Sequence, residues 1–191
     1  MELIMTRKYL FFLLPLYGIG LSTPATAVNM NIDFTANIIA TTCKIALQAL
    51  NGSKVTVAGT NLYTLTIPDV GLDKIIKQGS EAQADFKLVA TECSNGLSTI
   101  STKISGASTS GNLVRNESTA TPAATNIGMG FKRYGNADSA FITPNNTAIV
   151  TWSAAEVTQG LDMTVALREI TKNQGTIGPF EASATFSFTY Q

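Results

Sequence analysis

The two cysteines, Cys43 and Cys93, are the most reactive side chains in this sequence. The chain contains no histidine, which excludes a Ser–His or Cys–His catalytic pair and an imidazole metal ligand. Nothing obvious in the sequence would lower the pKa of either thiol, so a catalytic thiol is not expected. The carboxylates are scattered, and neither a glycine-rich phosphate loop nor a nucleophile motif is present. The sequence therefore predicts a non-enzymatic protein without a metal or other cofactor.

Composition narrows the class of protein further. The 191 residues include 13 Lys+Arg and 13 Asp+Glu, only 14% of residues are charged, and 45% are hydrophobic. Nucleic-acid binders usually carry a basic excess, which this chain lacks, so no nucleic-acid partner is expected. Because the chain is so apolar and weakly charged, it can bury a hydrophobic core. Its length fits a single domain.

The first 27 residues have the organisation of a secretory signal peptide. A positive region, Arg7 and Lys8, precedes an apolar run over 9–21, and the small residues Ala25-Thr26-Ala27 complete a cleavage pattern. The apolar run is about 13 residues long, whereas a bilayer-spanning helix needs about 20. The sequence therefore predicts cleavage after Ala27 and an exported protein that does not span the membrane.

Export determines how the cysteines are interpreted. In an oxidising compartment, an even pair usually forms a disulfide, and here the pair would be Cys43–Cys93. In the entropic model, closing a loop of this length stabilises the fold by about 4 kcal/mol. The alternatives are two free thiols or a bridge between two chains.

The rest of the chain has the pattern of an all-β protein. Apolar residues alternate with other residues over 86–91, 127–131 and 161–168, as expected of half-buried strands. Turn dipeptides such as Asn51-Gly52 and Asn95-Gly96 separate the alternating runs. Segments 71–78 and 153–159 are long enough for a single helical turn each, and 107–125 is expected to be a surface connection. Short strands with turns between them favour an antiparallel sandwich.

The C-terminal segment ends in a regular alternation. Six apolar residues occupy every second position up to the penultimate residue: Phe180, Ala182, Ala184, Phe186, Phe188 and Tyr190. Chain ends usually fray unless they are held in place, so we expect this strand to lie inside a sheet.

A second alternating run begins directly after the expected cleavage site. Its apolar positions include Met30, Ile32, Phe34, Ala36 and Ile38, and no turn residue interrupts it over 28–40. Thirteen residues at about 3.3 Å each span roughly 40 Å, twice a typical strand. The run is therefore either an extension that projects from the domain or a long edge strand within it. A projecting apolar strand needs a cover to avoid aggregation.

These features together resemble the type 1 fimbrial pilin family of the chaperone–usher pathway. The segment from Ile32 to Cys43 is similar to that family's N-terminal extension running into its first cysteine. Residues 86–93 are similar to the strand that ends at its second cysteine. Gly178, fourteenth from the end, and the penultimate Tyr190 match its C-terminal signature. The resemblance covers essentially the whole mature chain, with one departure: the family commonly has glycine where Ala36 stands.

The resemblance implies a fold and a mechanism of assembly. The fold would be an immunoglobulin-like sandwich that lacks its last strand and is completed by a donor strand from another subunit. Residues 1–27 would be the signal peptide, 28–40 the donor-strand extension running into the first strand, and 41–191 the pilin domain. The donor residues would be Met30, Ile32, Phe34, Ala36 and Ile38. The groove-edge strand, which the chaperone also recognises, would carry Gly178, Phe180, Ala182, Ala184, Phe186, Phe188 and Tyr190.

The resemblance also implies partners and a location. A periplasmic pilus chaperone would fill the groove first, and an outer-membrane usher would then exchange the chaperone for a neighbouring pilin subunit. The product would be a head-to-tail polymer, a fimbria on the cell surface that supports adhesion. The smallest replacement for glycine, Ala36, is expected to make insertion slower or more selective.

Other kinds of binding protein remain as alternatives. A minor tip or adaptor subunit, or a carbohydrate-binding adhesin-like module, could use Trp152, Tyr63 or Tyr134 to stack on sugars. Trp152 follows Ile149 and Val150 in an apolar run, which favours a position in the core. A fimbrial adhesin of this family would also need a separate lectin domain, for which the mature chain is too short. The remaining alternative is a secreted sandwich that folds and acts alone.

Overall fold

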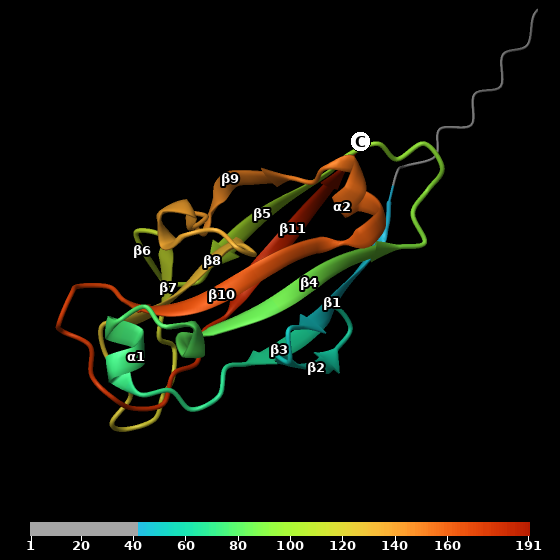
Figure 1. The fold of residues 1–191 in the computed structure, drawn as a ribbon. Helices are drawn as coiled ribbons and strands as arrows, with labels where there is room; N and C mark the ends of the chain where they lie inside the picture. Colours follow the sequence, from blue (N-terminus) through green and yellow to red (C-terminus); the bar gives the residue numbers. More distant parts are fainter. Residues whose placement is uncertain (1–41) are drawn as a thin grey trace, which may run out of the picture. The chain divides into compact units, whose positions relative to one another are not determined.

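The computed structural model describes residues 42–191, and within them the regular secondary structure is mainly β-strand (Figure 1). The helical elements are single turns: α1 (Leu72–Ile76), η1 (Ser80–Ala82), η2 (Asp138–Ala140) and α2 (Ala154–Gln159). The strands are, in chain order, β1 (Lys44–Leu50), β2 (Lys54–Gly59), β3 (Leu62–Thr66), β4 (Gln83–Thr91), β5 (Ile100–Gly106), β6 (Thr109–Ser110), β7 (Leu113–Arg115), β8 (Ile127–Arg133), β9 (Asn145–Thr151), β10 (Leu161–Glu169) and β11 (Ala184–Tyr190).

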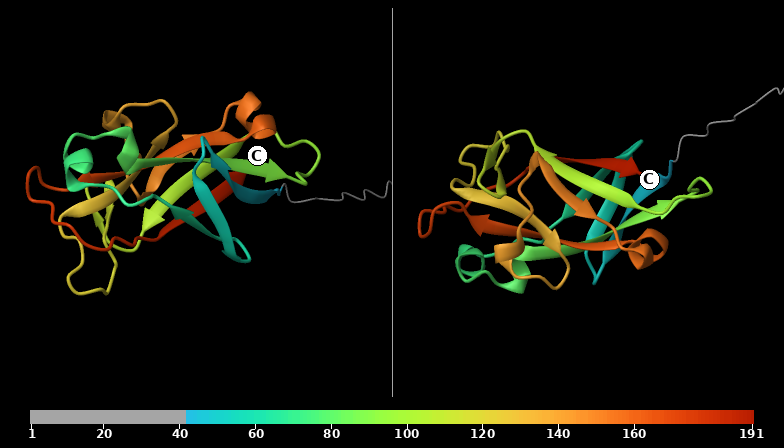
Figure 2. Two further views of the ribbon diagram at one scale, coloured as in Figure 1. Left: turned by 60° about the horizontal axis from the view of Figure 1, so that its bottom comes forward. Right: turned by 90° about the horizontal axis from the view of Figure 1, so that it is seen from above.

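The strands form two main sheets and a hairpin. One sheet has the order β1-β4-β10-β8-β7-β6, the other has the order β11-β5-β9, and β2 pairs with β3 alone. Every pairing between the described strands is antiparallel. Figure 2 shows the two layers from the side, with β4 and β10 in one and β5 and β11 in the other. The predicted all-β antiparallel sandwich is therefore confirmed.

The core lies between the two layers and follows from the period-two patterns. Inward residues of β4 and β10, such as Phe86 and Met163, are each only 1% exposed. From the opposite layer, Ile100 and Ile104 of β5 pack into the same cluster. Strands β4, β8 and β10 lie where the alternation predicts them. The two predicted helical turns are present as α1 and α2.

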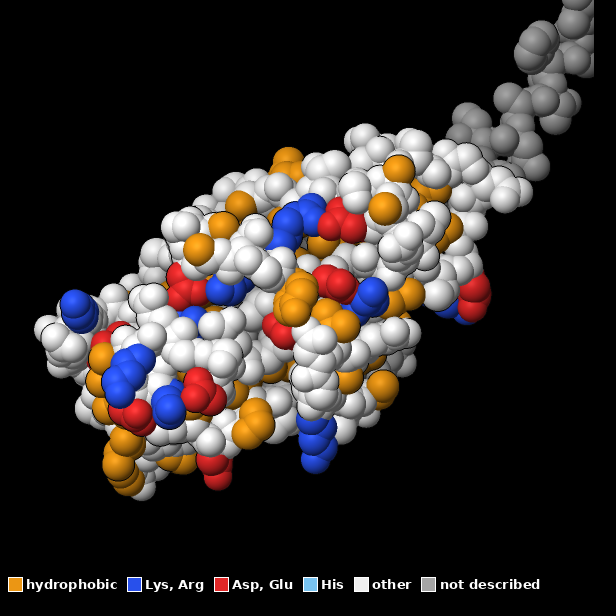
Figure 3. Space-filling model, viewed as in Figure 1, with side chains coloured by type: hydrophobic (Ala, Val, Ile, Leu, Met, Phe, Trp, Pro, Cys, Tyr) orange, Lys and Arg blue, Asp and Glu red, His pale blue; other side chains and the backbone are white. Residues whose placement is uncertain are grey.

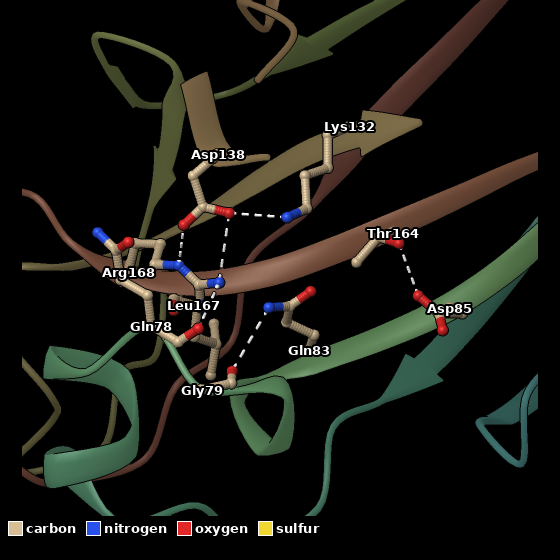
Figure 4. Close-up of polar contacts among 9 residues, drawn as sticks. All are labelled: Gln78, Gly79, Gln83, Asp85, Lys132, Asp138, Thr164, Leu167 and Arg168. Atoms are coloured by element: carbon tan, nitrogen blue, oxygen red, sulfur yellow. Dashed lines mark hydrogen bonds and ion pairs between the residues drawn. The ribbon is translucent and has the colours of Figure 1, made fainter. Parts of the chain in front are cut away.

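The outer face of the larger sheet is more buried than alternation predicts. Lys132 of β8 and Arg168 of β10 point away from the core, yet they are only 5% and 4% exposed. The η2 turn covers them, and Asp138 of that turn accepts hydrogen bonds from Lys132 Nζ at 2.7 Å and Arg168 Nε at 2.5 Å (Figure 4). Both cations thus share a single carboxylate under the β8–β9 connection.

The connection expected over 107–125 contains more structure than predicted. It includes the short strands β6 and β7, and Leu113 and Val114 of β7 are both buried. Two adjacent buried residues do not alternate, so the period-two criterion does not detect this strand.

The predicted disulfide is confirmed. It joins Cys43, just before β1, to Cys93, just after β4, across Cα atoms 4.1 Å apart. The bridge fixes the first strand of the domain to its neighbour. The expected signal peptide (1–27) and donor extension (28–40), with Met30, Ile32, Phe34, Ala36 and Ile38, lie outside the described residues.

Candidate functional site: a groove between two sheet edges

The two sheets leave an open side. Among the described strands, β1 pairs only with β4, and β11 pairs only with β5. At one end the two edges are tied together, because the Tyr190 hydroxyl donates a hydrogen bond to the Cys43 carbonyl at 3.3 Å. The end of β11 therefore lies beside the start of β1, and away from this tie a groove separates the two strands.

This groove is apolar and has a volume of about 790 Å³. Ile45 and Leu47 line it from the β1 side, and Phe186 and Phe188 line it from the β11 side. Its floor consists of core residues from the larger sheet: Phe86, Leu88, Phe131 and Val165. Tyr63 and Leu65 of the β2–β3 hairpin also reach it. An extended segment with alternating apolar side chains fits such a surface.

The apolar face of β11 is only partly covered by the described residues. Its apolar residues alternate as regularly as those of β4, but Phe186 and Phe188 are only half-buried, whereas Phe86 is 1% exposed. The Phe186 ring packs edge-to-face on Phe86 and Phe131, at centroid distances of 6.0 and 5.4 Å. One side of this aromatic cluster thus belongs to the core and the other side faces the groove.

The groove continues into a second apolar pocket of about 720 Å³ toward α1. The two cavities share Leu65, Ile67, Met129 and Ala182 as lining residues. Asp69 and Glu181 are the charged residues that line this pocket, while Lys44 lines the groove and forms an exposed ion pair with Glu92. The combined cavity therefore suits an apolar segment longer than β11 alone.

The predicted C-terminal residues line both parts of this cavity. Ala182, Ala184, Phe186, Phe188 and Tyr190 line the groove, and Gly178, Phe180 and Ala182 line the pocket near α1. The strand itself begins at Ala184, because residues 178–183 run alongside the 116–124 segment instead. Asn116 holds them there by donating to the Ala124 and Pro179 carbonyls and accepting from the Glu181 amide.

Burial affects the ionisation of one groove residue. Tyr190 loses solvent at the tied end of the groove, and this burial raises the pKa of its phenol above the ordinary value. The hydroxyl therefore stays protonated at physiological pH and donates to the Cys43 carbonyl.

The sequence alone did not predict two parts of the groove, namely the β1 wall opposite β11 and the floor. Ile45 and Leu47 were not singled out, although a signal for them exists in the sequence. Ile45, Leu47 and Ala49 occupy every second position after Cys43. This alternation predicts a strand that directs these side chains to one face. The floor residues come from β4, β8 and β10, and only the fold brings them together.

Gly178 occupies a position that requires glycine. Its φ is +149°, and a Cβ added there would lie 2.5 Å from the Ala124 amide nitrogen and 2.7 Å from the Ala123 carbonyl carbon. We expect Gly178→Ala to lower the stability of the assembled protein by about 1–3 kcal/mol, because backbone atoms cannot move aside as a side chain can. Thermal unfolding of assembled subunits measures this loss.

The matched control for this substitution is Gly59→Ala. A Cβ at Gly59 would meet only the Leu62 side chain, at an ordinary distance of 3.7 Å. Unfolding of Gly178→Ala at the same temperature as Gly59→Ala would contradict the steric argument.

Among the aromatic residues considered for sugar stacking, Trp152 is buried, Tyr63 lines the groove and Tyr134 is 51% exposed. Within 42–191, no group of His, Cys, Asp or Glu side chains is arranged to hold a metal ion. Trp152 is 2% exposed and donates from Nε1 to Thr102 Oγ1 at 2.8 Å, so its expected core position is confirmed. On the face that Figure 3 shows, basic and acidic side chains are interspersed and form no basic stripe. No helix in this part of the chain is long and apolar enough to cross a bilayer.

Comparisons with known proteins identify the family of this chain. The chain belongs to the fimbrial protein family, whose model matches residues 30–191. It is 45% identical over 181 residues to the uncharacterized fimbrial-like protein YadM of Escherichia coli (strain K12), covering 92% of this chain and 94% of that protein. Membership of this structural family confirms the predicted non-enzymatic class.

Two solved structures are also similar to this chain. The P pilus rod subunit PapA matches with a TM-score of 0.46 and 14% identity, covering 84% of this chain and 100% of that one. A subunit in a chaperone–usher pilus structure matches with a TM-score of 0.48 and 13% identity, covering 87% of this chain and 98% of that one.

Proposed function

We propose that this protein is a structural subunit of a surface fimbria and that its sandwich is completed by the extension, residues 28–40, of a neighbouring copy. The single observation that carries the proposal is the apolar groove between the unpaired edges of β1 and β11. A strand placed there would bury the half-exposed faces of Phe186 and Phe188 and supply hydrogen-bond partners to both edges.

The extension has the composition that this groove requires. Its alternating Met, Ile and Phe side chains can enter the groove, and each buried side chain of this size contributes about 1.5–3 kcal/mol. The family match begins at residue 30, so it includes most of this segment. Several such side chains together give a favourable binding free energy between subunits, even after the entropic cost of ordering the segment is subtracted.

The same groove would need protection by helper proteins before assembly. An incomplete sandwich exposes an apolar surface and two free sheet edges, which promotes aggregation. A periplasmic chaperone that lends a strand would protect the groove, and an outer-membrane usher would allow exchange for the next subunit. Because each subunit donates at one place and accepts at another, the contact does not close and a filament results.

Deletion of residues 28–37 tests this function. The truncated protein should co-purify from the periplasm with an immunoglobulin-like chaperone in a one-to-one ratio, because its groove is intact. It should fail to attach to the groove of another subunit, because it has no strand to donate. Mixing purified complexes and separating the products on a native gel measures the attachment.

The full-length mature protein, purified in the same way, is the control and should form multimers. Multimers of the truncated protein that form at the full-length rate would overturn the donor role of the extension. A truncated protein that is stable without any chaperone would overturn the incompleteness of the fold.

A further inference from the structure

The outer face of the β11-β5-β9 sheet is almost uncharged. The side chains on this face are mostly hydroxyls, and Lys103 is the charged residue among the strand residues that share it. These residues are Thr185, Ser187 and Thr189 of β11, Ser101, Lys103 and Ser105 of β5, and their partners Asn145, Ile149 and Thr151 of β9. None of the ion pairs between the described residues involves Lys103. Its ammonium group is one strand away from the open groove edge.

The extension also carries a single charged side chain. Asp33 is the charged residue within 28–40, and it lies in the middle of this run. It alternates with the apolar positions, between Ile32 and Phe34, so its side chain points outward when those two enter the groove. A strand in the groove would therefore place a carboxylate on the same face as Lys103.

The free edge of β11 defines which residues a new strand would face. Gln191 and Thr99 exchange both backbone hydrogen bonds at 2.9 Å. By alternation, Ser187 directs its backbone groups to β5, whereas Phe186 and Phe188 direct theirs into the groove. An added antiparallel strand would therefore make a non-hydrogen-bonded pair with Ser187, with Cα atoms about 4.5 Å apart.

We infer that the inserted extension lies with Asp33 opposite Ser187 and that, in this register, Lys103 forms an ion pair with Asp33. The inference rests on the proposed function and adds the strand register and an ion pair that favours it. Ser187 is small and lies directly between the two charged residues, since Lys103 is its cross-strand partner. The flexible four-carbon stem of lysine can cross one serine to reach a carboxylate on the next strand.

The apolar residues are consistent with this register when the added strand runs antiparallel to β11. Met30 then faces Tyr190, Ile32 faces Phe188, Phe34 faces Phe186, Ala36 faces Ala184 and Ile38 faces Ala182, so every predicted anchor lies along the lined cavity. A shift by two residues in either direction would move Asp33 away from Ser187.

A cross-linking experiment on the full mature chain tests the register. Asp33→Cys combined with Ser187→Cys places two thiols on a non-hydrogen-bonded pair, a spacing that suits a disulfide. Two matched controls combine Asp33→Cys with Thr185→Cys or with Thr189→Cys. After assembly and oxidation, a covalent ladder on a non-reducing denaturing gel is expected for the Ser187 pair, at least about tenfold stronger than for either control.

The other gel patterns have distinct meanings. A stronger ladder from the Thr185 or Thr189 pair would overturn the register and leave the donor function standing. No ladder from any of the three pairs would overturn the register, while the deletion of residues 28–37 tests the donor function separately.

Charge exchange tests the ion pair itself. Lys103→Glu and Asp33→Lys should each slow assembly about fivefold at low salt, because each places like charges together, and the double variant should recover the original rate. Lys172→Glu is the control for a changed net charge and should assemble at the original rate. Failure of the double variant to recover, or slowing by Lys172→Glu equal to that by Lys103→Glu, would overturn the ion pair.

Discussion

Phe34→Asp is expected to abolish the joining of subunits while leaving the chaperone-bound subunit intact. In the inferred register, Phe34 faces Phe186 and joins the aromatic cluster that Phe186 forms with Phe86 and Phe131. The variant loses about 1.5–3 kcal/mol of burial. It also places a carboxylate among apolar side chains without a partner, which costs several kcal/mol more. A total loss of about 4 kcal/mol corresponds to roughly a thousandfold weaker joint.

Mixing purified chaperone complexes and following multimers on a native gel measures this effect. The matched control is Thr35→Asp, which introduces the same charge one residue later at an outward position. This control should assemble within about fivefold of the original rate. Because the change lies in the donor and not in the groove, chaperone binding should be equal in both variants. Multimers of Phe34→Asp at the Thr35→Asp rate would contradict an inward role for Phe34.

The strands that carry the core could be predicted from the sequence because each has one buried face. In β4, Phe86 and Leu88 are buried, whereas Asp85, Lys87 and Val89 between and beside them are only half-buried. The same reasoning fails for the outer face of β10, where Arg168 suggests a solvent-exposed position. Its burial depends on η2, which arrives from a distant part of the chain, and no local pattern contains that information.

The groove could be predicted only in part, for a different reason. Alternation in β11 indicates that Phe186 and Phe188 need a cover, but it does not indicate which segment provides one. The cover can come from the same chain or from another. The half-burial of both side chains, and the missing pairing between β1 and β11, show that within residues 42–191 no segment provides it. The residues of the groove floor come from three strands, and their proximity depends on the tertiary fold, so the sequence did not identify them.

The cluster around Asp138 leads to the second large expected effect. Asp138→Ala would leave the ammonium group of Lys132 and the guanidinium group of Arg168 buried without their shared carboxylate. Removing one partner from a buried ion pair typically costs about 3–5 kcal/mol. Trp152, the only tryptophan of the chain, reports unfolding of assembled subunits by its fluorescence.

Asp73→Ala is the control for this substitution. Asp73 pairs with Lys77 at 3.9 Å on the exposed surface of α1, so its removal should change the free energy of unfolding by less than about 1 kcal/mol.

The same cluster predicts a dependence of stability on pH. Burial alone would raise the pKa of Asp138, but hydrogen bonds from Arg168 and Lys132 outweigh burial and lower this pKa below its ordinary value of 3.8. The folded state therefore binds this proton less readily than the unfolded chain does. Its stabilising contribution is complete above about pH 3.8 and is lost as the pH falls through the lowered pKa. The difference in unfolding temperature between the original protein and Asp138→Ala should thus be largest near neutral pH and shrink below pH 3.8. A difference that stays constant down to pH 2 would show that the ionised carboxylate does not hold the two cations.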